Sequence, residues 1–154
     1  MSDQQQQPIF NIEKIYVKDL SLEVPNAPQV FMSTDAPQLE VQLAHSVQYV
    51  DGALFEVTLK VTVTAKAGEK TVFLVEAAQA GIFQIRNVPQ GDLDPILGMV
   101  CPNVLFPYAR ETISDTVNRA GFPPVLLAPV NFEALYQQRL ATQQQQGPKI
   151  EIAH

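Results

Sequence analysis

Residues 38–65, QLEVQLAHSVQYVDGALFEVTLKVTVTA, decide the fold of this chain. Apolar side chains occupy every second position on both sides of the pair Asp51-Gly52, which is the spacing of half-buried strands. An Asp-Gly pair between two such runs favours a tight hairpin turn. The stretch therefore predicts two antiparallel strands, over residues 38–49 and 53–65, each with one apolar and one polar face.

The same period continues on both sides of this hairpin. A turn at residues 66–69 leads to a further run over residues 71–85, and an earlier run covers residues 10–24. The earlier run is predicted to place five large side chains on one face: Phe10, Ile12, Tyr16, Leu20 and Leu22. The sequence thus predicts four antiparallel strands, with one face of the sheet open to water.

The second half of the chain changes from strand to helix periodicity. A short helix is predicted over residues 92–100, broken by Pro102, and a longer helix over residues 104–119. Gly121 suits the position just after a helix, where the backbone often turns left-handed. Together these patterns predict an α+β fold, with a four-stranded antiparallel sheet and two main helices packed on one side of it.

The ends of the chain differ from its middle. Asn131 is a suitable N-cap for a final helix that reaches about Thr142. Runs of glutamine lie near both termini and bury too little apolar surface to become ordered, so residues 1–8 and 143–154 are predicted to be mobile tails. Residues 9–142 then form one domain, which agrees with a length of 154 residues.

Composition excludes several classes of function. The formal net charge of −6 is opposite to the basic surface that nucleic-acid binders need. Cys101 is the only cysteine, so an intrachain disulfide is impossible and a reducing compartment is expected. The N-terminus lacks the pattern of a signal peptide, and no apolar run approaches the roughly 18 residues of a membrane helix. We therefore expect a cytoplasmic protein.

The sequence contains few candidates for catalytic residues. His154 is the last residue, and His45 falls in the apolar register of a strand, where a core or interface role is favoured over that of a base or ligand. Cys101 precedes a proline in apolar surroundings, and the pair Asp92 and Asp94 suits the acidic first turn of a helix. Nucleotide-binding, hydrolase and zinc motifs are all missing. We expect no enzyme, no cofactor and no metal.

Apolar side chains gather in two segments that proline keeps irregular. One is residues 24–37, and the other is residues 120–132, AGFPPVLLAPVNF, whose three prolines fit neither a helix nor a central strand. These side chains either complete the core or form a groove for apolar, extended peptide, where each buried side chain contributes roughly 1.5–3 kcal/mol. The candidate groove residues are Val30, Phe31, Met32, Phe122, Val125, Leu126, Leu127, Phe132 and Tyr136.

The polar face of the sheet carries a second candidate surface. Asp19 and Glu23 share one side of the first strand, and Leu74 and Glu76 share one side of the last. If these two strands are neighbours, the four residues form an acidic patch around an apolar spot. If they are not, the residues belong to an ordinary solvated face.

Five segments form a series: EVPNAP at residues 23–28, VTVTA at 61–65, QAGIFQI at 79–85, CPNVLFPYARE at 101–111 and LAPVNFEALY at 127–136. In this order and spacing they closely resemble the SecB family of bacterial protein-export chaperones. The resemblance covers nearly the whole chain between its tails. It implies a homotetramer, a dimer of dimers, in which each subunit has its first strand beside its last.

The resemblance also implies roles for particular residues. SecB proteins hold unfolded preproteins before export and deliver them to the SecA ATPase. By position, the SecA contact falls on Asp19, Glu23, Leu74 and Glu76, and the client groove falls on residues 24–37 and 121–136. The helix that joins the dimers matches residues 104–119, with Leu105, Tyr108, Ile113 and Val117 at the tetramer interface. In the family a mobile C-terminal tail also contacts SecA, and the tail of this chain, with Lys149 as its one lysine or arginine, differs from that pattern.

The resulting hypothesis is an ATP-independent chaperone whose partners are unfolded preproteins, SecA and further copies of itself. The alternative is an oligomeric carrier of small apolar ligands, in which the two irregular segments close over a pocket. An enzyme is a third and more distant hypothesis, and it would depend on His45.

Overall fold

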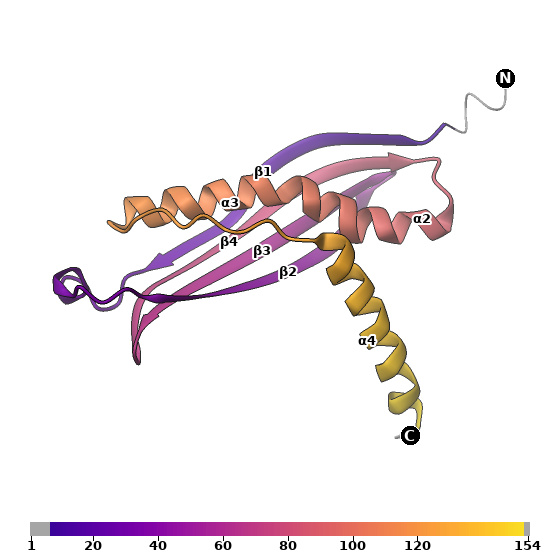
Figure 1. Ribbon diagram of the computed structural model, residues 1–154. Coiled ribbons are helices and arrows are strands. Elements are labelled where there is room, and N and C mark those ends of the chain that lie inside the picture. The colour runs from indigo at the N-terminus through magenta and orange to yellow at the C-terminus, as the bar shows by residue number, and fades with distance from the viewer. Residues whose placement is uncertain (1–6, 153–154) are drawn as a thin grey trace.

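The computed structural model describes residues 7–152 of the chain, and side chains up to residue 144. A four-stranded antiparallel sheet carries one long helix across one face, and a second long helix leaves the sheet near its edge (Figure 1). This architecture confirms the predicted fold class. In chain order the elements are β1 (Ile9–Glu23), a 3₁₀ turn (Gln29–Met32), β2 (Gln38–Asp51), β3 (Leu54–Ala67), β4 (Lys70–Arg86), α2 (Gln90–Pro95), a π-helical turn (Ile96–Val100), α3 (Cys101–Arg119) and α4 (Phe132–Ile152).

The strands lie in the order β1-β4-β3-β2, and every neighbouring pair is antiparallel. The first strand therefore lies beside the last, as the family resemblance implied. Gly52 and Gly68 close the two hairpins with φ of 57° and 63°, a left-handed conformation that glycine adopts at little cost because it has no Cβ. In this sheet β1 and β2 are the edge strands.

Helix α3 covers the middle of the sheet. A stripe of its residues, spaced by four, packs on β3 and β4 and has no exposed surface: Cys101, Leu105, Ala109, Ile113 and Val117. Gly81 of β4 allows this close approach, because a Cβ there would lie 3.1 Å from Cδ2 of Leu105. Each large apolar side chain buried in this way stabilises the fold by roughly 1.5–3 kcal/mol, so this buried stripe ties the helix to the sheet.

The prediction that Pro102 breaks the helix is wrong. Helix α2 leads into the π-helical turn, and that turn leads into α3 without a gap. Pro102 lies in the first turn of α3. Just before it, the N–H of Cys101 donates to the carbonyl oxygen of Ile96, five residues back. This wider turn gives space to the proline ring, which in a regular α-helix clashes with the carbonyl group four residues earlier.

Two helix ends agree with the sequence. Gly121 follows α3 with φ of 96°, and the next N–H, that of Phe122, donates to the carbonyl oxygen of Val117 at 3.3 Å, as in a Schellman motif. At the start of α4, Oδ1 of Asn131 accepts a hydrogen bond from the N–H of Ala134 at 3.0 Å. This is the N-cap contact that the sequence predicted.

Two β-bulges in β1 change which of its residues face α3. The pairing of β1 with β4 shifts at Glu13 and again at Lys18, because each is one extra residue opposite β4. Between the bulges Tyr16 turns to the far face, the face of the sheet opposite α3, where its hydroxyl contacts Glu56. The prediction that Tyr16 shares a face with Leu20 is therefore wrong, since a strict period of two does not survive an inserted residue.

The predicted tails lie partly outside the described residues, namely at residues 1–6 and 153–154. Helix α4 continues to Ile152, past the predicted end near Thr142, and points away from the sheet (Figure 1). The mobility of residues 143–154 stays a prediction. Within residues 7–152, no helix combines the length and the apolar character needed to cross a membrane.

Candidate functional site

The crossover loop, residues 24–37, is ordered by hydrogen bonds of its own. The N–H of Val30 donates to the carbonyl oxygen of Asn26 at 2.9 Å, which forms the entry to the 3₁₀ turn. The amide of Asn26 in turn donates to the carbonyl oxygen of Thr71 at 2.9 Å, near the start of β4. The loop is thus fastened to the sheet, and it presents Val30 and Phe31 toward the chain that follows α3.

The return segment, residues 121–131, runs back alongside α3 without helix or strand (Figure 1). Its central side chains alternate, with Val125 and Leu127 buried in the core and Leu126 between them 82% exposed. An extended backbone turns successive side chains to opposite sides, and the prolines prevent the segment from coiling into a helix. The segment therefore seals the core with one set of apolar side chains and exposes another.

An aromatic cluster forms where the crossover loop meets the return segment. The ring of Phe122 lies against the rings of Phe31 and Phe73, with centroids 5.1 Å apart in both pairs. Gly121 makes this possible, because a Cβ there would lie 3.1 Å from the ring of Phe31. Beside the cluster lies a pocket of about 500 Å³, which we call the first pocket and which is lined mainly by apolar side chains of both segments and of the sheet.

The nine predicted groove residues are divided between two pockets and their surroundings. Five of them line the first pocket: Val30, Phe31, Phe122, Val125 and Leu126. Phe132 and Tyr136 line a second pocket at the start of α4. Leu127 is buried in the core, whereas Met32 is 81% exposed and lines neither pocket.

The second pocket, of about 330 Å³, lies between α4, β2 and the π-helical turn. Nη1 of Arg139 lies 2.8 Å from Nδ1 of His45, and its Cζ lies 5.4 Å from the ring centroid of Tyr136. The hydroxyl of Tyr136 donates to Oδ2 of Asp94 at 2.6 Å. Because a guanidinium can only donate, Nδ1 of His45 accepts and carries no proton.

Electrostatics agree with a neutral His45. Burial, followed by the neighbouring charge of Arg139, lowers the pKa of His45 below its ordinary value of 6.5, and the carboxylate of Asp94 opposes this only in part. The hydrogen bond to Asp94 raises the pKa of the Tyr136 hydroxyl. The pocket therefore holds a cation, a neutral imidazole and a neutral phenol near neutral pH.

A strip along edge strand β2 connects the two pockets. Leu39 lines the first pocket, and Leu43 and His45 line the second. Val41 lies between them and is 45% exposed. These alternate residues share the face of β2 on the α3 side. The two pockets are thus the ends of one apolar path along the edge of the sheet.

Some lining residues were missed at the level of sequence. Leu39 and Phe73 line the first pocket, but strand periodicity assigns them to the sheet without revealing the loop that packs beside them. Arg139 could have been found, because it follows Tyr136 by three residues and so lies on the same face of the helix.

The acidic patch (Asp19, Glu23, Leu74 and Glu76) is assembled on the far face. Glu23 pairs with Leu74 across the β1–β4 ladder, and Asp19 pairs with Ala78, which shares the face of Glu76. The patch is not purely acidic, because Nζ of Lys60 lies 3.6 Å from Oε1 of Glu76. Its position confirms the expected strand neighbours, whereas its role in binding stays a prediction.

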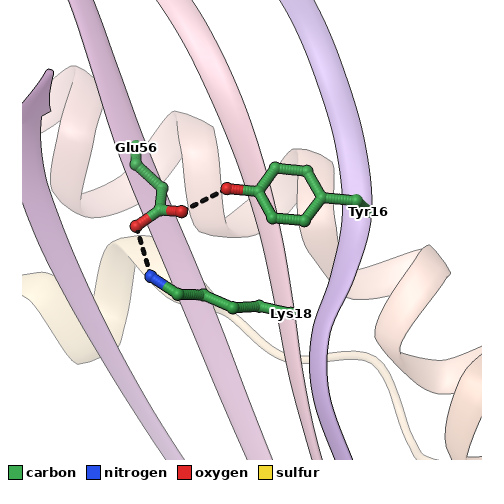
Figure 2. Close-up of polar contacts among 3 residues, drawn as sticks. All are labelled: Tyr16, Lys18 and Glu56. Carbon is green, nitrogen blue, oxygen red and sulfur yellow. Dashed lines mark hydrogen bonds and ion pairs between the residues drawn. The ribbon is translucent and has the colours of Figure 1, made fainter.

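The bulge at Lys18 brings Asp19 into this patch, since an unbroken strand would turn Asp19 toward α3. Figure 2 shows the contacts beside the bulge, in which Tyr16 and Lys18 both reach across β4 to Glu56 on β3. Nζ of Lys18 lies 2.7 Å from Oε1 of Glu56. Lys18 and then Tyr16 lower the pKa of the Glu56 carboxyl, while burial followed by Glu56 raises the pKa of Tyr16 to about 12.

The four predicted tetramer-interface residues do not lie on one surface. Leu105, Ile113 and Val117 have no exposed surface and pack within this chain's own core. Tyr108 is half exposed on the outside of α3. The sequence pattern identified a real apolar stripe, but the stripe faces the sheet, and of the four side chains Tyr108 alone is free to contact another copy.

Reactive groups are sparse in the described part of the chain. Burial raises the pKa of the Cys101 thiol to about 12, so this thiol is not a nucleophile near neutral pH. No cluster of three or more histidine, cysteine, aspartate or glutamate side chains in this part could hold a metal ion. The arrangement favours binding over chemistry.

Comparisons with known proteins agree with one another. The family model described as preprotein translocase subunit SecB matches residues 3–144. The protein-export protein SecB of Chromobacterium violaceum is 69% identical over 148 residues, which is 96% of this chain and 99% of that protein. The same-named protein of Methylobacillus flagellatus is 65% identical over 136 residues, covering 88% and 87% of the two chains.

A solved structure has a similar fold at low sequence identity. It is a SecB-like chaperone of Mycobacterium tuberculosis in complex with a peptide from an antitoxin, with a TM-score of 0.66 and 18% identity. The match covers 79% of this chain and 90% of that one.

Proposed function

This chain belongs to the SecB family of preprotein translocase subunits, and we propose that it is an ATP-independent chaperone that binds unfolded preproteins and keeps them competent for export. The family is one of protein-export chaperones and not of enzymes. The observation that carries the proposal is the apolar path along β2, which begins at the first pocket and ends at the second. We propose that this path is the client groove.

The physical basis of binding is apolar burial with few directional demands. Each side chain that a client buries contributes roughly 1.5–3 kcal/mol, whatever its exact identity. The exposed Leu126 and the half-exposed Phe31 offer such surface next to the first pocket. An extended client can also pair with the free edge of β2, because main-chain hydrogen bonds do not depend on sequence. A surface of this kind binds many unfolded chains and excludes folded ones.

The proposed partner at the far face is the SecA ATPase. The acidic patch combines three carboxylates with the half-buried Leu74, and it lies on the face of the sheet opposite the client groove. This separation supports a sequence of events in which SecA engages a chaperone that still holds its client. The proposal places the protein in the cytoplasm, where preproteins precede export.

The proposed assembly is a homotetramer built as a dimer of dimers. Edge strand β1 exposes a row of large apolar side chains on the α3 side: Phe10, Ile12, Val17, Leu20 and Leu22. A continuous row of this kind is uncommon on a monomer and favours cover by another copy. Several client grooves on one particle raise the effective concentration of each further client segment, so modest affinity at each groove gives tight capture.

Size-exclusion chromatography with mass detection tests these proposals together. The full-length protein is mixed with a reduced, unfolded protein, with its folded form, and with SecA. We expect a tetramer that gains mass with the unfolded protein and with SecA but not with the folded form. A particle that ignores the unfolded protein and takes up small apolar ligands instead would contradict the chaperone function and favour a carrier.

A further inference from the structure

The second pocket contains a charge that the apolar path does not require. Arg139 lies half-buried at the mouth of a pocket whose other walls include Leu43, Leu59 and Phe132. Burying an arginine costs free energy unless its charge is paired. A site that served apolar side chains alone would gain nothing from it, so the contacts of Arg139 are informative.

Within the described residues, Arg139 forms no ion pair with a carboxylate. Its hydrogen-bond partner is the neutral imidazole of His45, reached by Nη1 alone. The carboxylate of Asp94, which faces the same cluster, accepts from the Tyr136 hydroxyl instead. A guanidinium has five N–H donors in a planar fork, so most of the donors of Arg139 have no partner among the side chains that the structure describes.

The surroundings of Arg139 fix its position. Its guanidinium lies over the ring of Tyr136, and a Cβ at Gly98 would come within 2.8 Å of Nη2. Glycine at this place in the π-helical turn is therefore what gives the guanidinium its space. The ring and the imidazole contact the guanidinium, and the glycine leaves room for it beside the pocket.

We propose that the second pocket is a carboxylate-recognising subsite, which takes an acidic side chain or a C-terminal carboxylate of a client segment flanked by apolar residues. Planar, charge-assisted pairing with a carboxylate is the contact that a guanidinium makes best. The leucine and phenylalanine walls accept the neighbouring apolar side chain. Asp94 repels a second carboxylate, so the preference is moderate. This inference rests on the proposed client groove and adds a chemical preference to one end of it.

The test uses fluorescein-labelled, extended apolar peptides that bind the intact full-length protein, measured by anisotropy. Two peptides are amidated at the C-terminus and differ by one central glutamate or glutamine, and a third has the glutamine and a free C-terminal carboxylate. We expect the glutamate peptide to bind about three- to tenfold more tightly than its glutamine partner. Tighter binding of the third peptide that is lost in Arg139→Gln identifies the terminal carboxylate as a ligand of the same subsite.

Three variants locate the preference. Arg139→Gln removes the charge, so the glutamate and glutamine peptides should then bind with equal affinity. Gly98→Ala displaces the guanidinium and should reduce the preference in part. Arg110→Gln is the matched control, because Arg110 also lies over a ring, that of Phe106, but outside the second pocket. This control should keep the full preference.

The outcomes are distinct. If the glutamine peptide binds but the unmodified protein shows no preference for glutamate, the carboxylate subsite is wrong and the client groove stands. If the preference persists in Arg139→Gln, or in an Arg139→Leu variant with an unchanged melting temperature, the subsite lies elsewhere and the inference is overturned. If none of the peptides binds, the proposed function itself fails.

Discussion

The buried stripe of α3 and the return segment are both rich in apolar residues, but only the stripe buries all of them. In α3, apolar residues four apart share one face, and Leu105 and Ile113 lose all of their exposed surface against the sheet. In the return segment, neighbouring apolar residues face opposite ways, so that Val125 is buried and Leu126 is 82% exposed. The comparison teaches that the backbone, and not the hydrophobicity of the residues, decides which apolar surface remains open.

Proline is the reason for the difference. The prolines of the return segment keep it extended next to a helix that could otherwise have continued. An extended chain needs a partner on both sides to bury all of its side chains, and on the outer side the described part of this chain offers none. The exposed surface beside the first pocket is thus a stable property of the fold.

The largest effect should separate the two regions by stability. Leu105→Ala leaves a cavity under α3 and should lower the free energy of unfolding by about 3 kcal/mol. Leu126→Ala removes an exposed side chain and should change it by less than about 0.5 kcal/mol. Urea unfolding followed by circular dichroism measures both, and similar losses in the two variants would show that the return segment is packed as tightly as α3.

The second largest effect should separate the two regions by their part in binding an unfolded client. Leu126→Asp introduces a charge where a client would bury hydrocarbon, so the Kd for an unfolded client should rise about tenfold or more. Leu126→Met keeps the apolar surface and serves as the control. An unchanged Kd in a Leu126→Asp variant of normal assembly and stability would remove the return segment from the groove.

A third experiment asks whether the far face acts independently of these apolar surfaces. Glu76→Lys reverses a charge in the acidic patch and should weaken SecA binding about fivefold or more, while client capture is unchanged. Glu40→Lys makes the same charge change on the same face, outside the four patch residues but in the same cross-strand row as Leu74, so it should have a smaller effect. Loss of client capture in Glu76→Lys would contradict the separation of the two surfaces.

The smallest effect concerns pH at the second pocket. The folded-state pKa of His45 lies below its ordinary value of 6.5, so the unfolded chain takes up a proton first as pH falls. The stability contributed by neutral His45 is therefore complete well above pH 6.5 and is lost as pH falls below it. For a half-buried group we expect a change below about 1 kcal/mol.

Thermal unfolding between about pH 7.5 and 5.5 measures this effect. Because glutamine does not titrate, the His45→Gln variant should lose less stability over this range than the original protein, although its side chain can still accept from Arg139. Equal losses in both proteins would mean that folding does not disfavour protonation of His45, which would contradict its role as acceptor from Arg139.

Most of the fold could be predicted because its signals are local. The strand period around Asp51-Gly52, the glycine after α3 and the cap at Asn131 each depend on a few neighbouring residues. The prediction failed at Pro102, where a wider helical turn gives space to the proline ring, and at Tyr16, where an inserted residue changes the strand period. Such irregularities are stabilised by distant contacts, such as the one between Lys18 and Glu56 across the sheet.

The candidate surfaces were harder to predict than the fold. The sequence pointed to the apolar segments and to the acidic patch, but it could not divide the groove into two pockets or bring Arg139 to His45, which are 94 residues apart. It also assigned Leu105, Ile113 and Val117 to a tetramer interface, whereas their side chains fill the core of the chain itself.

By itself, then, the sequence determined where strands, turns and helices form, because hydrophobic period, capping and turn chemistry act between near neighbours. The tertiary structure alone decided which apolar side chains stay exposed, which carboxylates share a face and which cation lies in the second pocket. Those properties depend on the segment that packs opposite each residue, and in a folded chain that segment comes from far along the sequence.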